Sequence, residues 1–206
     1  MPPRRIVIVS AGLGQPSSTR LLADRLGLVV ERSLGERGVE AELQVVELRD
    51  LGQDLINNLL TGFPSPTLQA AIDAVATADG VIAVTPIYSA SYSGLFKLFF
   101  DVLERGGLAG RPVLIAATAG TPRHSLALEH ALRPLFAYFG AVVVPTAVFA
   151  ATDDWGTAQT TVDASLAQRI ERAGRELAAA VAARNPGAPA DRFTDPVPFD
   201  RLLAGD

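Results

Sequence analysis

Short apolar runs recur along the chain and predict buried β-strands. Residues 5–9 read RIVIV and residues 79–85 read DGVIAVT, with no alternation of polar side chains. Apolar runs of this length, rich in β-branched residues, are typical of strands that are covered on both faces of a parallel sheet. The pattern predicts five strands, over residues 5–9, 41–48, 79–85, 111–118 and 141–149.

The segments between these runs carry apolar residues at the three- and four-residue spacing of amphipathic helices. Residues 65–77 open with Ser65 and Pro66, a favourable N-cap and first-turn pair. A short helix and a loop are expected within residues 49–64. Because strands and helices alternate, we predict an α/β fold with a five-stranded parallel sheet and helices on both faces. The other predicted helices cover residues 18–37, 94–104, 125–139 and 156–184.

The chain is expected to form one domain over residues 1–184, followed by a proline-rich C-terminal arm, residues 185–206. The arm retains large apolar side chains, which are too many for a simply solvated tail. We therefore expect it to fold over a neighbouring subunit or near the ligand pocket. These side chains are Phe193, Phe199, Leu202 and Leu203.

The amino-acid composition indicates which partners and which kinds of site the protein lacks. The 206 residues are 49% hydrophobic and carry a net charge of −4, and because the basic residues do not cluster, we expect no nucleic-acid partner. With no cysteine and only His124 and His130, we expect neither a thiolate nucleophile nor a metal site. No apolar stretch approaches the roughly 18 residues of a membrane span, so we expect a cytoplasmic protein without membrane contact.

Ligands of open parallel sheets bind beyond the carboxyl ends of the strands, which selects loops 10–19, 85–93 and 118–125. The first loop combines small hydroxyl residues with the amides of a helix N-terminus, a combination that favours a phosphate. It lacks both the lysine of a GxxxxGK[ST] loop and the GxGxxG pattern, which argues against nucleotide hydrolysis and weakens a dinucleotide site. Simple helix capping by Ser17 or Ser18 is the alternative.

The other two loops offer planar and polar surfaces. Tyr88 in TPIYSASYSG presents a flat face that suits a planar heterocycle, although packing of Tyr88 and Tyr92 at a subunit interface is equally consistent. In TAGTPRHS, Gly120 allows close approach of the backbone to a ligand. Arg123 suits either a phosphate or solvent, and His124 suits either a substrate contact or a helix cap.

Three stretches together resemble the NAD(P)H-dependent FMN reductase family: VIVSAGLGQPSSTRLLA, TPIYSASYSGLFKLFFDVL and AATAGTPRHSL. The most specific element is a P-x-Y-x-x-S-x-x-G-x-x-K pattern, met by Pro86, Tyr88, Ser91, Gly94 and Lys97. The resemblance covers roughly residues 4–150 and is closest to the actinobacterial FMN reductases that partner luciferase-like monooxygenases. Many family members carry an arginine in the first loop where this chain has glycine or glutamine, and we do not expect the later arginine, at position 20, to replace it.

The resemblance implies a flavodoxin-like three-layer sandwich that binds FMN at the three loops. It implies contacts to the FMN phosphate from Ser10, Gln15, Ser17, Ser18 and Thr19. It implies that the isoalloxazine is lined by Pro86, Ile87, Tyr88, Ser89 and Ser91. It implies contacts to the pyrimidine edge from Thr118, Ala119, Gly120 and Thr121, while Arg123 is the candidate for the 2′-phosphate of NADPH.

The activity implied is hydride transfer from C4 of NADPH or NADH to N5 of FMN, with no protein acid or base and no catalytic residue. The reduced flavin would leave for a flavin-dependent monooxygenase, and the protein would be a homodimer or homotetramer. Lys97 and Asp101, four residues apart on a predicted helix, are expected to form a surface pair rather than a flavin contact. Two alternatives stay open: a reductase of quinones, azo compounds or metal ions that keeps its FMN, and a flavodoxin-like electron carrier without NAD(P)H activity.

Overall fold

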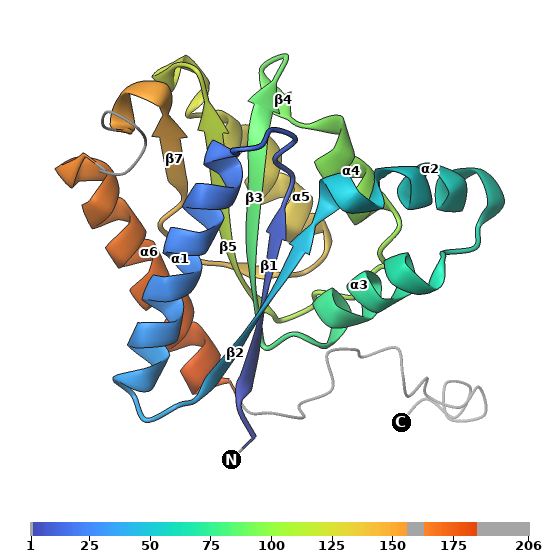
Figure 1. The fold of residues 1–206 in the computed structure, drawn as a ribbon. Helices are drawn as coiled ribbons and strands as arrows, with labels where there is room; N and C mark the ends of the chain where they lie inside the picture. The colour runs from blue at the N-terminus through green and yellow to red at the C-terminus, as the bar shows by residue number, and fades with distance from the viewer. Residues whose placement is uncertain (1, 156–162, 185–206) are drawn as a thin grey trace, which may run out of the picture.

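A twisted parallel sheet forms the centre of the molecule in the computed structural model, which describes residues 2–155 and 163–184. The strand order is β2-β1-β3-β5, and both β6 and β7 continue the sheet beyond β5 (Figure 1). This is the order of flavodoxin-like doubly wound sheets, so the predicted fold class is confirmed. The parallel strands are β1 (Arg4–Ser10), β2 (Ala41–Glu47), β3 (Gly80–Tyr88), β5 (Pro112–Ala119), β6 (Val142–Val143) and β7 (Val148–Ala151).

The predicted fifth strand is wrong as a continuous element, because it is divided into β6 and β7. Pro145 lies between the two segments and has no N–H to donate to a sheet. The next residue, Thr146, donates its backbone N–H and its hydroxyl to the carboxylate of Glu176, at 2.7 and 2.8 Å. These bonds tie the break in the strand to the last helix.

Helices cover both faces of the sheet. On one face α1 (Ser18–Gly35) and α6 (Ala164–Ala183) lie side by side, and Gly174 allows close contact with Val29 (Figure 1). The opposite face buries an aromatic cluster in which Phe100 lies 4.7 Å from Phe96 and 4.9 Å from Phe136, centroid to centroid. The helices on or near that face are α2 (Gly52–Thr61), α3 (Pro66–Thr77), α4 (Gly94–Asp101) and α5 (Arg133–Tyr138).

Most helix predictions are confirmed, with three corrections. Ser65 caps α3 as predicted, accepting from the N–H of Leu68 at 3.1 Å. The helix predicted over 94–104 ends three residues early, and the one predicted over 125–139 is regular only in α5. The segment before α5 consists of a 3-10 turn, η2 (Pro122–His124), and a π turn, η3 (Leu128–Leu132). The missing N–H of Pro134 accounts for this break, since it removes one α-helical bond.

The third correction concerns the last helix. It begins at Ala164 after the cap Asp163, whereas residues 156–162 of the prediction lie outside the described residues. The predicted arm, residues 185–206, also lies outside them. Among the helices that the structure describes, none is both long enough and apolar enough to cross a membrane.

Candidate functional site

A cavity of about 240 Å³ opens at the carboxyl ends of β1, β3 and β5. This is the position that the topology predicts for a ligand, and all three selected loops contribute to it. Many of the predicted site residues line the cavity: Ser17, Ser18, Thr19, Pro86, Ile87, Tyr88, Thr118, Ala119 and Gly120.

The first loop folds tightly over the start of α1. The hydroxyl of Ser17 caps the helix by accepting from the N–H of Arg20 at 3.2 Å. A Cβ atom at Gly12 would lie 2.0 Å from that hydroxyl oxygen, so a side chain there would displace the capping hydroxyl. The first N–H groups of a helix have no partner within the helix, and together with the helix dipole they favour an anion at this end.

Three buried hydroxyl groups lie at or beneath this loop, those of Ser10, Thr19 and Thr118. The hydroxyl of Ser10 is fully buried at the end of β1 and makes no hydrogen bond to the described residues. Thr19 and Thr118 are also buried, and their hydroxyl oxygens lie 2.8 Å apart. The contact between Thr19 and Thr118 joins the first loop to the third and sets the spacing between the two walls of the cavity.

The second loop is a tight hairpin. β3 continues through Tyr88 and pairs with β4 (Ser91–Tyr92) in antiparallel fashion, so this loop is more regular than the sequence predicts. Its two turn residues, Ser89 and Ala90, have φ of 49° and 67°, as a type I′ turn requires. Tyr88, 49% exposed, lies at the rim of the cavity, whereas Tyr92 packs against Phe96 in the core.

The base of this hairpin is fixed by hydrogen bonds. The N–H of Ser93 donates to the hydroxyl of Thr85 at 3.0 Å, and both residues are buried. The hydroxyl of Ser93 then caps α4 by accepting from Phe96. On α4 the ammonium group of Lys97 pairs with Asp101, as predicted.

Several predicted residues do not line the cavity. Ser10 lies beneath the loop, and exposed Gln15 lies on its outer side. Ser89 and Ser91 form the hairpin away from the lining, and Thr121 and Arg123 are exposed at η2. Four residues that the sequence analysis did not select also line the cavity: Leu13, Gly14, Pro16 and Thr152. Of these, Thr152 follows the end of β7, a strand end that the topological rule would also select.

Two arginines lie close to the first loop. Arg20 donates to Asp24 at 2.7 Å and to Glu47 at 2.6 Å, and these two hydrogen bonds raise the pKa of its guanidinium. Arg49 reaches the loop from η1 (Leu48–Leu51), just beyond β2. Sequence reasoning missed Arg49 because the loop after β2 was not among the three considered.

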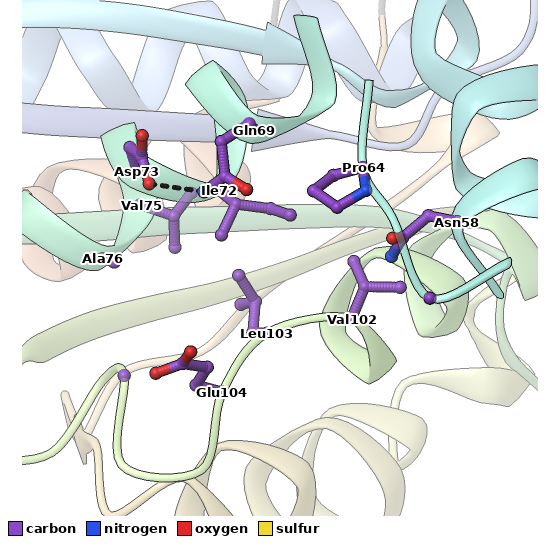
Figure 2. Close-up of a pocket in the computed structure, with 12 residues that line it drawn as sticks. Asn58, Pro64, Gln69, Ile72, Asp73, Val75, Ala76, Val102, Leu103 and Glu104 are labelled. Carbon is purple, nitrogen blue, oxygen red and sulfur yellow. Dashed lines mark hydrogen bonds between the residues drawn. The ribbon is translucent and has the colours of Figure 1, made fainter. Parts of the chain in front are cut away.

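A larger cavity, of about 370 Å³, lies between α3 and the segment that follows α4 (Figure 2). None of its lining residues belongs to the three loops just described. Asp73 and Glu104 contribute carboxylates to its lining, and Gln69 donates to Asp73 at 2.7 Å. Because the lining includes these two acids and no basic side chain, the cavity does not suit an anionic ligand. Among the described residues, no group of three or more potential metal ligands gathers at either cavity.

Comparison with known protein families identifies the family to which this chain belongs. The model of the NADPH-dependent FMN reductase family matches residues 4–156. The chain belongs to this family. It is therefore an oxidoreductase that uses FMN and a nicotinamide nucleotide, as the resemblance implied.

Individual relatives agree with this assignment. The chain is 38% identical to an FMN reductase (NADPH) of Pseudomonas aeruginosa over 153 residues, 74% of this chain and 80% of that protein. It is 37% identical to the NADH-dependent FMN reductase SfnF of Pseudomonas fluorescens, over 85% of this chain and 91% of that protein. The structure is similar to that of an oxidoreductase from Corynebacterium diphtheriae, with a TM-score of 0.84 and 43% identity over 89% of this chain and 99% of that one.

The residues at the smaller cavity fit FMN. A phosphate monoester needs several hydrogen-bond donors and little bulk, and the first loop offers the hydroxyls of Ser17 and Ser18, free helix amides and a glycine turn. The buried hydroxyl of Ser10, without a partner among the described residues, is a further unused donor in the same region. Pro86, Ile87 and the half-exposed Tyr88 give the second wall an apolar and aromatic surface suited to a flavin ring.

Proposed function

We propose that this FMN reductase releases its reduced flavin to a partner monooxygenase, and that it belongs to the subgroup that serves luciferase-like monooxygenases. The observation that carries the proposal is the size of the cavity. At about 240 Å³ it is smaller than the roughly 300–1,000 Å³ typical of sites that enclose a small molecule. A flavin held there would be only partly enclosed, which supports its exchange with solvent. We place this exchange in the cytoplasm, where nicotinamide nucleotides are regenerated.

The protein residues bind and orient the reactants. Ser17, Ser18 and Thr19 and the neighbouring amides would hold the phosphate of FMN, the buried hydroxyl of Ser10 is a further donor there, and Gln15 lies on the outer side of the same loop. Pro86, Ile87 and Tyr88 would line the isoalloxazine, positioned by the hairpin of Ser89 and Ser91. Thr118, Ala119 and Gly120 would face the pyrimidine edge, with Thr121 just beyond the lining.

FMN, when bound, supplies the acceptor for the hydride of the nicotinamide. The lining contains no histidine and no acidic side chain, so it holds neither of the side chains that most often act as a general base near neutral pH. Tyr88 is half-exposed at the rim of the cavity, so its ring would be accessible to a second planar group. The contribution of the chain is thus to align two rings rather than to react with them.

Arg123 is our candidate for recognition of the 2′-phosphate of NADPH. It is exposed on η2, within the third loop and outside the cavity lining, where a guanidinium can pair with a phosphate. The relatives include enzymes named for NADPH and for NADH, so the preference rests on details of each chain. An Arg123→Ala variant is expected to lose its preference for NADPH over NADH, and a retained preference would contradict the assignment.

The proposal is tested by titrating the purified protein with FMN while NADPH oxidation is followed at 340 nm. A colourless protein whose rate saturates with added FMN supports flavin as an exchangeable substrate. A yellow protein that is active without added flavin, and only with a quinone or dye, would make it a reductase that keeps its FMN. Flavin binding without any NAD(P)H oxidation would indicate an electron carrier.

We also propose that the protein is a homodimer or homotetramer and that residues 185–206 act as an arm on a neighbouring subunit or near the site. A truncation before Asn185 is expected to change the oligomeric state or the activity. Size-exclusion chromatography with light scattering measures the first and NADPH oxidation the second. Unchanged values for both would contradict a role for the arm.

A further inference from the structure

The first loop, where we place the FMN phosphate, has no cation of its own. Residues 11–17 read AGLGQPS and contain no lysine, arginine or histidine. A phosphate monoester carries about −1.5 to −2 charges at pH 7. Neutral donors hold such a group, but an arginine nearby adds the charge-assisted bonds that distinguish a phosphate from a hydroxyl.

Arg49 brings a guanidinium to this loop from the neighbouring strand. In the parallel register Ser10 of β1 faces Glu47 of β2, so the segment after β2 lies beside the loop after β1. Nη1 of Arg49 donates to the carbonyl oxygen of Gly14 at 3.3 Å. With the Gln15 amide turned so that its oxygen faces the guanidinium, that oxygen accepts from Nη2 at 2.7 Å and from Nη1 at 2.9 Å.

The charge of Arg49 is little compensated by acidic groups. Its Nε is buried and makes no hydrogen bond among the described residues. The carboxylate recorded nearest to it belongs to Asp50, at 3.5 Å, and that side chain is 70% exposed, so solvent screens the pair. Arg20, in contrast, forms ion pairs with two carboxylates at hydrogen-bond distance, and these neutralise its charge.

We propose that Arg49 supplies the positive charge for the FMN phosphate at the first loop. It lies against the outer side of the loop, bonded to Gly14 and Gln15, and raises the potential at the free amides and hydroxyls of the inner side. It is a positioning and charge-bearing residue for flavin binding rather than a catalytic residue. This inference rests on the proposed placement of FMN in the cavity.

The test compares the affinities of FMN and riboflavin, which differ only in the phosphate. Flavin fluorescence quenching or calorimetry on the full chain gives both dissociation constants. In Arg49→Ala the dissociation constant of FMN should rise about ten-fold, the scale of a single charge that acts through a partly screened site, while that of riboflavin changes little. Arg49→Lys should retain more of the preference because the charge persists. Arg37→Ala, which removes the same charge beyond the far end of α1, is the matched control and should have no effect.

Three outcomes overturn the inference. An unchanged preference for FMN in Arg49→Ala would remove the role altogether. Equal losses for FMN and riboflavin would mean that Arg49 only maintains the loop. Equal losses of FMN preference in the alanine and lysine variants would exclude the charge as the cause. If the unaltered protein binds neither flavin, the proposed function itself fails, so the two failures are distinguishable.

Discussion

The hydrogen bond between Thr19 and Thr118 offers a direct test of how the site is assembled. It joins the first turn of α1 to the end of β5, and both side chains are almost fully buried. Replacement of either threonine by valine preserves the shape of the side chain and removes one hydroxyl. The remaining hydroxyl then stays buried without its partner.

The expected loss of stability depends on whether one hydroxyl or both are removed. A buried polar group that loses its partner costs about 1–3 kcal/mol, whereas replacement of both partners by apolar groups of the same shape is nearly neutral. Each single variant should therefore lower the free energy of unfolding by about 1–3 kcal/mol, and the double variant by less than either. In a chain of this size, each kcal/mol lowers Tm by about 2–4 °C.

The assay is a double-mutant cycle measured by urea or thermal unfolding. Thr67→Val, at an exposed position of α3, controls for the substitution itself and should change stability by less than about 0.5 kcal/mol. A double variant whose loss equals the sum of the single losses would refute the reasoning, because it would show that the two hydroxyls act independently. FMN affinity measured on the same variants would show whether the spacing of the loops matters for binding.

Three other predictions follow from single features of the fold. Ala90→Gly relieves a left-handed backbone conformation and should raise the free energy of unfolding by about 0.5–1 kcal/mol in a urea titration; a loss would contradict strain at the hairpin. Gly174→Ala places a Cβ 2.4 Å from Val29 and should destabilise the protein by about 1 kcal/mol or more, despite the better helix propensity; higher stability would exclude close packing of α1 on α6. A hydrogen bond from Arg133 lowers the pKa of Glu129 in the folded protein relative to the unfolded chain. The ionised carboxylate therefore stabilises the fold at pH values above its pKa in the unfolded chain, and this stabilisation is lost as the pH falls through its lower pKa in the folded protein. Glu129→Gln should therefore lower Tm at pH 7, and the difference from the unaltered protein should shrink as pH falls below the unfolded pKa of about 4.3; a difference that stays constant as the pH falls further would contradict the linkage.

The sequence predicts the sheet well because the information is local. Apolar β-branched runs such as those of β1 and β3 need no partner to be identified, and the caps of α1 and α3 are readable from Ser17 and Ser65. It fails where one residue interrupts a pattern that is otherwise continuous. Pro145 divides a run of apolar residues into β6 and β7, and Pro134 disturbs a segment that has helical spacing.

The site could be predicted in part for a similar reason. Topology selects the strand ends, and the small polar residues there are visible in the sequence. The sequence does not show the direction in which each side chain points. The prediction therefore did not foresee that Ser10 lies beneath the first loop or that Ser91 pairs within a hairpin. Arg49 is invisible to a search of the loop itself, because its nearness depends on the pairing of β2 with β1.

That pairing leads to a last prediction about Gln15. If the loop needs one cation and does not depend on its origin, an arginine placed in the loop should replace the one supplied from β2. Gln15 is exposed and its amide faces Arg49, so a guanidinium at this position puts its charge in the same region. Gln15→Arg in the Arg49→Ala background should restore the preference for FMN over riboflavin. Gln44→Arg, which adds the same charge on the exposed side of β2, should not. Failure of rescue with wild-type thermal stability would mean that the bonds of Arg49 to the loop, rather than its charge, hold the phosphate in place.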